Sequence, residues 1–268
     1  MAMNYGLLSQ TAHYSKTPHP VLYHLTGKLF GLSNLGIYFM AYAYGKWIDD
    51  QIDSLWLKSE DGQKILERQR RIMAGGLIPE NVPEKIGAYL GAYFKDKDAN
   101  MLGKWYSQFL HSFDLDIERK YNIITKDKLQ ERMFVLGSSF INFCQGILAP
   151  SEVLNETFVA HTIKAYIQLD MLLDLEDDLK VGYCNIPFES LENTFRHPHE
   201  IFNNSFPDIK IYLGPYVRDT IIDIRSAMKE ALPMIQSVRS LTFRFFLKKM
   251  YKKRLHKLER LDLDWKER

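Results

Sequence analysis

Two clusters of aspartates are the residues of this sequence with the clearest capacity to hold metal ions. The first contains Asp49 and Asp53, and the second contains Asp170, Asp174 and Asp178. The carboxylates are spaced four residues apart, so on a helix each cluster projects from one face. Mg²⁺ prefers oxygen ligands and commonly bridges one or two carboxylates to the phosphates of a substrate. The spacing therefore predicts two carboxylate faces that meet across one cavity mouth and hold Mg²⁺ against one diphosphate.

A run of like charges on one helix face requires something positive opposite it. Each like-charged pair costs about 0.2–0.5 kcal/mol on an exposed helix, and burial raises the cost to several kcal/mol per ion. The second cluster also has a strong apolar side, made by Leu169, Leu172 and Leu175. A solvated acidic face and pairing with Lys or Arg are the two alternatives to metal binding. Two such clusters, each joined to an apolar helix, favour the metal.

Helices are the elements that the sequence offers to position these carboxylates. Apolar or small residues recur at three- and four-residue steps through 35–42 and 134–146, which is typical of helices. The alternation typical of strands is scarce. Breakers separate the periodic segments at residues 74–83, at Ala149-Pro150 and at Gly214-Pro215. With no internal repeat or flexible linker, we predict one all-α domain over residues 1–268.

Composition limits the classes of partner. The chain has 268 residues, 46% of them hydrophobic, and a net charge of +2, which gives no reason to expect nucleic acid. The two cysteines fit neither a disulfide framework nor a zinc site. The polar N-terminus lacks the apolar core of a signal peptide, and the apolar stretches are interrupted or too short to span a bilayer. We expect a cytoplasmic protein.

The residues around both clusters resemble the squalene/phytoene synthase family, the head-to-head branch of the class I isoprenoid synthases. Residues 42–53 are similar to that family's first motif, in which a Tyr-Ala pair leads into Asp-Asp-x-x-Asp. Residues 168–187 are similar to the second motif, with aspartates four and eight positions after a residue that is usually Asn, then Gly and Pro. Residues 113–116 and 125–136 resemble its central acidic segment and next helix. The similarity extends from about Gly31 to Lys257.

The resemblance implies an antiparallel helical bundle around a central apolar cavity, in which an allylic diphosphate is ionised with several Mg²⁺ ions. It implies that two prenyl units are then joined head to head, and it leaves a need for NADPH open. The implied catalytic and metal-binding residues are Asp49, Asp53, Asp174 and Asp178, with Asp170 as a further metal ligand. The resemblance places Tyr42 and Lys46 near the diphosphate. Our predicted substrate-binding residues also include Tyr38, Phe39, Phe140, Phe143 and Gln168.

Physical reasoning supports the same chemistry. A diphosphate departs when metal ions neutralise its developing charge. The remaining carbocation must be kept from water, so the walls around it should be apolar. Aromatic faces stabilise such a cation by about 0.5–2 kcal/mol each through cation–π attraction. For any single aromatic residue here, ordinary core packing is the competing interpretation.

Several positions depart from the family pattern and keep other functions open. The N-terminal region has no Ser-x-Ser-Phe, Lys46 replaces the common Arg, Asp170 stands where Asn is usual, and 183–185 replace an Arg-containing stretch. These changes weaken the case for two diphosphate substrates. Asp170, Gly182 and Asn185 also resemble the bacterial tetraprenyl-curcumene synthases, which cyclise one long prenyl diphosphate. A class I terpene cyclase is therefore one alternative, and a non-catalytic helical assembly factor with a relict synthase fold is another.

The C-terminal run from Arg244 to Arg268 holds ten Lys or Arg against four Asp or Glu, and we predict that it makes loose contact with an anionic membrane surface. Each basic residue near such a surface contributes roughly 1 kcal/mol, and salt screens the attraction. The protein should sediment with anionic vesicles at low salt and be released at high salt. Equal partition onto neutral and anionic vesicles would contradict the prediction.

Overall fold

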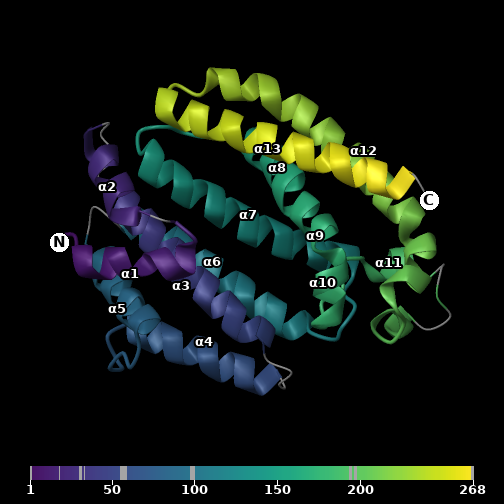
Figure 1. The fold of residues 1–268 in the computed structure, drawn as a ribbon, viewed down its shortest axis with the longest axis horizontal. Coiled ribbons are helices and arrows are strands. Elements are labelled where there is room, and N and C mark those ends of the chain that lie inside the picture. Colours follow the sequence, from purple (N-terminus) through teal and green to yellow (C-terminus); the bar gives the residue numbers. More distant parts are fainter. Residues whose placement is uncertain are drawn as a thin grey trace. The chain divides into compact units, whose positions relative to one another are not determined.

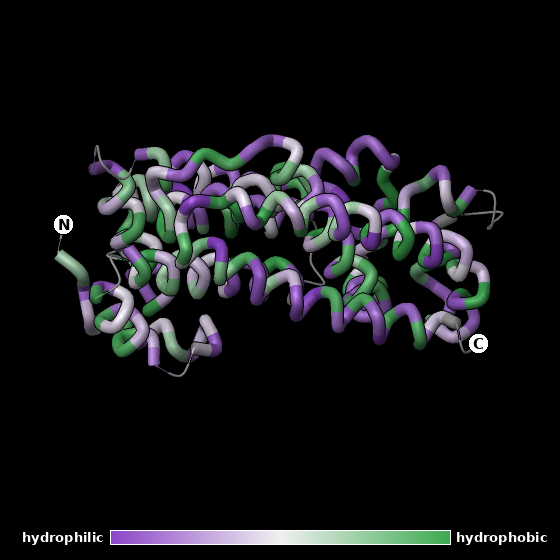
Figure 2. Tube along the Cα trace, turned by 90° about the horizontal axis from the view of Figure 1, so that it is seen from above, coloured by the Kyte–Doolittle hydropathy of each residue, from purple (hydrophilic) through white to green (hydrophobic). Residues whose placement is uncertain are grey.

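The computed structural model describes residues 2–17, 19–29, 32, 34–54, 59–96, 100–192, 195 and 198–266. Their regular structure is helical, without strands, which confirms the predicted all-α class (Figure 1). Green and purple segments alternate along single helices in Figure 2, as expected of amphipathic helices. In this part of the chain, no helix is long and apolar enough to cross a membrane.

The chain divides into two compact units. The first unit contains residues 1–117 and 142–151, and the second contains residues 118–141 and 152–268. The boundary falls within α6 (Asn100–Arg119) and within α7 (Lys126–Leu148). The other helices of the first unit are α1 (Tyr5–Ser15), α2 (Pro20–Leu29), α3 (Leu35–Ser54), α4 (Ser59–Met73) and α5 (Val82–Phe94). The one-domain prediction stays a prediction.

Helix α3, which ends with the first aspartate cluster, is held at both its beginning and its middle. At its beginning, the backbone N–H of Gly36 donates to Nδ1 of the buried His24 on α2, at 3.0 Å. This bond satisfies one of the amide groups that a helix N-terminus leaves without a partner. In its middle, Ile37, Met40 and Ile48 are fully buried in the main hydrophobic core.

A buried polar network joins α3 to α4 and α5. The Tyr44 hydroxyl donates to Gln69 Oε1 at 2.9 Å, and Gln69 Nε2 donates to Glu84 Oε1 at 3.4 Å. Glu84 is 2% exposed and accepts two bonds from the Arg68 guanidinium, at 2.8 and 3.0 Å. These bonds hold the pKa of Glu84 below its ordinary value, although burial opposes the shift. A buried charge with every partner in place fixes one relative placement of the three helices.

The second unit is built around the second aspartate cluster. It contains α8 (Glu156–Ile163), a π-helical turn at Lys164–Gln168, α9 (Leu169–Leu173), α10 (Leu175–Lys180), α11 (Phe188–Leu191) and a 3₁₀ turn at Pro198–Phe202. Two long helices complete it, α12 (Phe206–Ser237) and α13 (Leu241–Lys266), which pack side by side (Figure 1).

Helix α12 runs through Gly214-Pro215, so the break predicted there is wrong. Proline removes one backbone hydrogen bond and crowds the residue before it. Here that residue is Gly214, which has no Cβ to clash with the proline ring. Leu213 and Val217 on either side are fully buried, and packing of this kind outweighs the local cost. The breaks predicted near residues 74–83 and at Ala149-Pro150 are confirmed, because α4 ends at Met73 and α7 at Leu148.

Gly91 lies where α5 crosses the end of α4, and its substitution should destabilise the fold. A Cβ built on Gly91 would lie 2.0 Å from the backbone oxygen of Met73, so Gly91→Ala must push two backbones apart. We expect a loss of about 1–3 kcal/mol or more in the free energy of unfolding, measured by urea denaturation. Gly76→Ala is the matched control, since its Cβ would meet the Arg71 backbone oxygen at an ordinary 3.5 Å. Equal stability of the two variants would refute this account.

Candidate functional site

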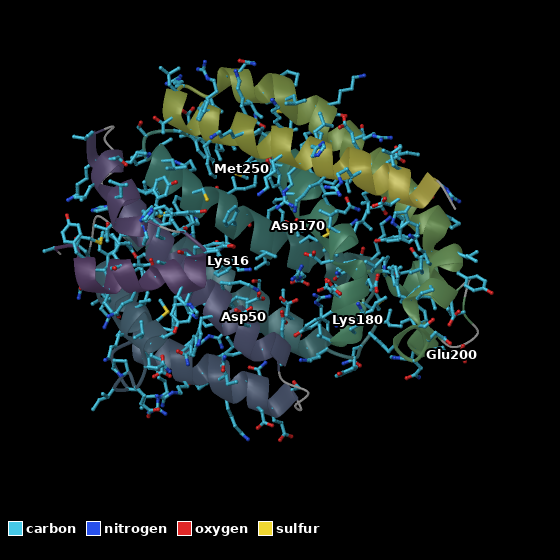
Figure 3. All side chains as sticks on the ribbon, viewed as in Figure 1. Lys16, Asp50, Asp170, Lys180, Glu200 and Met250 are labelled. Carbon is cyan, nitrogen blue, oxygen red and sulfur yellow. The ribbon has the colours of Figure 1, made fainter. Side chains whose placement is uncertain are left out.

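The first cluster places an ammonium group among carboxylates at the end of α3. Lys46 Nζ lies 2.6 Å from Asp49 Oδ2 and 2.8 Å from Asp50 Oδ1. Asp50 is labelled in Figure 3. Burial raises the pKa of Asp49, and the negative charges of Asp116 and Asp50 add to the shift, so the partly opposing Lys46 does not restore the ordinary value. Lys46 therefore compensates the Asp49 carboxylate only in part. Asp53 lies half-buried one turn further on.

Aromatic rings precede this charged group on the same stripe of α3. Tyr38, Tyr42 and Lys46 follow one another at four-residue steps, which places them on one helix face. The Tyr38 and Tyr42 rings are stacked, with centroids 6.4 Å apart, and Tyr42 is 44% exposed. Phe39 is partly buried against the main core. The stripe thus passes from aromatic faces to an ammonium group and then to carboxylates.

The spacing of the second cluster predicted one regular helix, but the structure shows an interrupted one. A π-helical turn precedes α9, and the helix is interrupted at Asp174, where ψ is 5°. Two backbone bonds nevertheless keep the helical register of the ladder: Asp174 N–H donates to Asp170 O at 2.9 Å, and Asp178 N–H donates to Asp174 O at 2.7 Å. Insertions of π-helix within α-helices occur frequently at functional sites.

Arg254 on α13 compensates the first carboxylate of the ladder. Its two terminal nitrogens donate to the two oxygens of Asp170, which Figure 3 labels. The guanidinium also lies over the Tyr166 ring, 5.1 Å from its centroid. A two-point bond of this kind is strong and fixes the orientation of both groups. Arg254 therefore compensates the charge of Asp170. Such pairing with Lys or Arg is one of the two alternatives to metal binding that the sequence left open.

Asp178 is held by an amide rather than by an ion pair. Asn185 Nδ2 donates to Asp178 Oδ2, and Arg119 Nη1 donates to Asn185 Oδ1 at 2.8 Å. Asn185 is 1% exposed and Arg119 is 4% exposed. The chain returns to this place through Gly182, whose φ of +92° is suited to glycine, and Gly182 O accepts from the Tyr121 N–H at 2.7 Å. The turn after α10 thus brings Asn185 to Asp178.

The remaining charge on the ladder is incompletely compensated. Burial, with the negative charge of Asp174, raises the pKa of Asp178 to about 6, although Asn185, Arg119 and Arg132 oppose the shift. Asp174 is more exposed, and its pKa is raised by partial loss of water and by the charge of Asp170, against Lys257 and Arg254. Carboxylates with raised pKa values favour a proton or a further cation beside them.

Asp174 and Asp178 fit Mg²⁺ in their chemistry, because they offer carboxylate oxygens whose pKa values stay raised by burial despite the cations nearby. Mg²⁺ commonly uses one or two carboxylates and takes its remaining ligands from water and phosphate. Among the residues that the structure describes, no three or more His, Cys, Asp or Glu side chains form a group that could hold a metal ion. Both oxygens of Asp170 bind Arg254, so its predicted metal role would require that bond to be given up.

The other predicted site residues are distributed between the two units. Phe143 is buried in the core of the first unit, with Phe94 and Tyr106 around it. Phe140 packs on a smaller core of the second unit, and Gln168 lines a pocket there. The first cluster belongs to the first unit and the ladder to the second, so their meeting across one cavity stays a prediction.

Sequence reasoning missed Arg254 and Arg119 as functional candidates. Arg254 was counted only within the C-terminal basic run, and Arg119 follows the central acidic segment without a distinguishing pattern. The sequence signal for Arg254 was indirect: a ladder of aspartates requires a cation, and a basic helix lies in the same chain.

Comparison with solved structures identifies a similar fold. The crystal structure of the squalene synthase HpnC from Alicyclobacillus acidocaldarius matches with a TM-score of 0.61, over 96% of this chain and 92% of that chain, at 15% sequence identity. No family model matches the sequence, and no curated protein matches it. At this identity the likeness establishes the fold alone, and it agrees with the predicted all-helical class.

The pKa of Asp178 is raised in the folded protein, so removal of its negative charge should stabilise the fold. Because the folded-state pKa of about 6 exceeds the ordinary 3.8, the stability that protonation contributes is present below 3.8 and is lost as pH rises through 6. Asp178→Asn should therefore raise the free energy of unfolding by roughly 1–3 kcal/mol at pH 7.5 with EDTA present, and by little at pH 3.5.

The control for this variant is Asp177→Asn, at an 84% exposed side chain paired with Lys180, which should change stability little at either pH. Urea denaturation at both pH values measures the difference. A gain for Asp178→Asn that is the same at pH 3.5 and 7.5 would mean that charge is not its cause.

Proposed function

We propose that this chain is a magnesium-dependent enzyme that ionises an allylic prenyl diphosphate and joins two prenyl units head to head. The observation that carries the proposal is the stripe on α3, where stacked Tyr38 and Tyr42 lead into Lys46, Asp49 and Asp53. A surface that is aromatic at one end and charged at the other suits a molecule with an apolar chain and a charged head. The ladder and the fold shared with a squalene synthase support the same substrate class.

Each side chain has a role that follows from its surroundings. Above pH 6 the Asp178 carboxylate is charged, and it would hold Mg²⁺ together with Asp174, with Asp49 and Asp53 in the same role on α3. When bound, Mg²⁺ neutralises phosphate oxygens and so assists departure of the diphosphate. Asn185 orients the Asp178 carboxylate, as partners of metal ligands commonly do. Lys46 offers an ammonium group to phosphate oxygens, and the tyrosine rings offer faces to an apolar, cationic chain.

A cyclase acting on one prenyl diphosphate is the second candidate, and the C-terminal helix favours it. A second diphosphate needs its own basic site, and besides Lys46 the candidates are three basic residues of α13, Arg244, Lys248 and Lys249. Arg244 Nε donates to Val238 O at 2.7 Å, and Lys249 lies over the Phe245 ring at 5.3 Å. Two of the three candidates are thus engaged within α13 and the turn before it.

Purified protein with Mg²⁺ should release diphosphate from a C10, C15 or C20 prenyl diphosphate. Partners of metal ligands alter activity by about 10–100-fold, so Asp174→Asn and Asp49→Asn should each lower the rate by more than about 100-fold while the fold is kept. Phosphate release and circular dichroism are measured together, with Asp177→Asn as the control that keeps activity. Full turnover in Asp174→Asn or Asp49→Asn would contradict the assignment of these residues as metal ligands.

Product analysis by gas chromatography–mass spectrometry separates the two candidates. Head-to-head joining gives a product with twice the carbon number and a rate that depends on two substrate molecules. Cyclisation gives a product with the carbon number of the substrate and a hyperbolic rate law. No turnover of any diphosphate by the correctly folded protein would favour the non-catalytic assembly factor.

A further inference from the structure

The second unit exposes three apolar side chains near the turn between α12 and α13. Leu241 is 75% exposed and Phe245 is 62% exposed. They stand four residues apart at the beginning of α13, which places them on one helix face. Val153, in the segment before α8, is 90% exposed. We call these three residues the apolar tip.

The two segments that form the apolar tip are tied together. The backbone N–H of Ser240 donates to Glu152 Oε2 at 2.9 Å, so the residue before Leu241 is bound to the residue before Val153. Leu154 packs on the smaller hydrophobic core and anchors its segment from within. The tip thus joins segments that are 88 residues apart in sequence. Exposed apolar side chains that gather in one place mark an interaction surface.

The helix beside the apolar tip is strongly cationic. Between Glu230 and Glu259 the sequence contains eight Lys or Arg and no Asp or Glu. Lys248 and Lys252 continue the face of Leu241 and Phe245 at three- and four-residue steps, and both are exposed. Ammonium groups therefore follow the apolar side chains along one face of α13.

The second half of the basic run is engaged within the protein. Arg254 binds Asp170, and Leu258 and Leu261 are buried. The acids of the run, from Glu259 onward, all lie in this half. The uncompensated positive charge therefore belongs to the first half of α13, next to the apolar tip, which the residue count alone did not indicate.

We propose that the apolar tip inserts into a bilayer containing anionic lipids, while Lys248 and Lys252 contact the headgroups. A bilayer offers negative charge and hydrocarbon next to each other, and Leu and Phe beside Lys are typical of helices that lie in this interface. Nucleic acid would match the charge but offers no apolar layer for Leu241 and Phe245. The proposal adds an apolar anchor to the electrostatic contact expected from the sequence. It does not depend on the proposed catalytic function.

Sedimentation of the whole protein with vesicles tests the proposal. At low salt, the wild type should bind phosphatidylcholine vesicles with about one-third phosphatidylserine roughly tenfold more tightly than vesicles of phosphatidylcholine alone. The double variant Leu241→Ser/Phe245→Ser keeps every charge and should bind the anionic vesicles about tenfold more weakly than the wild type, because insertion is lost. The matched control, Ile211→Ser/Ile222→Ser, alters two residues of α12 that are 80% and 62% exposed. It should bind as the wild type does.

A gain of binding tests the location of the anchor. Val153→Phe enlarges an exposed apolar side chain of the tip and should tighten binding to the anionic vesicles about threefold, which a misfolded variant would not do. Ile211→Phe, at the control position, should leave binding unchanged. Circular dichroism shows whether each variant keeps the helical fold.

Two results would overturn the proposal. Undiminished binding of Leu241→Ser/Phe245→Ser would show that the contact is electrostatic alone and that the tip does not insert. Failure of the wild type to bind anionic vesicles at low salt would exclude a lipid surface and leave the tip to a protein partner. Vesicle binding is measured without any diphosphate, so neither result can be confused with failure of the proposed function.

Discussion

The acidic segment 170–178 concentrates negative charge on one helix face, and the second unit is arranged around that charge. Like charges one helical turn apart repel, and partial burial increases the cost. The chain compensates them unequally. Arg254 binds Asp170 at two points, whereas Asp178 receives an amide from Asn185 and its pKa stays near 6. The uneven compensation leaves the second half of the ladder as the part that attracts a cation.

Several otherwise unrelated features follow from this constraint. Helix α13 must present Arg254 to α9, and the Tyr166 ring beneath the guanidinium helps to fix it there. The turn at Gly182 must return the chain so that Asn185 reaches Asp178. Arg119, in turn, supports Asn185 from the end of α6. Second partners of this kind orient carboxylates that bind metals, and here they belong to segments far apart in sequence.

The first unit meets a similar requirement by other means. Lys46 lies between two carboxylates of its own helix, so this pairing is local and leaves Asp49 with a raised pKa. The helix itself is anchored by the network from Tyr44 to Glu84 and by the cap that His24 provides. A rigid scaffold beneath a charged end is the arrangement expected of a site that must hold its geometry against repulsion.

The sequence by itself determined the helical class, the helical period over residues 35–42 and the shared register of Asp170, Asp174 and Asp178, because these depend on a local period of 3.6 residues. Only the tertiary structure decided that Arg254 binds Asp170, 84 residues away, that Phe143 belongs to a core, and that Gln168 lines a pocket of the second unit. The tertiary structure also explains why α12 continues through Pro215: burial of Leu213 and Val217 on either side outweighs the loss of one backbone hydrogen bond. Contacts between distant segments follow from packing, which no residue spacing records.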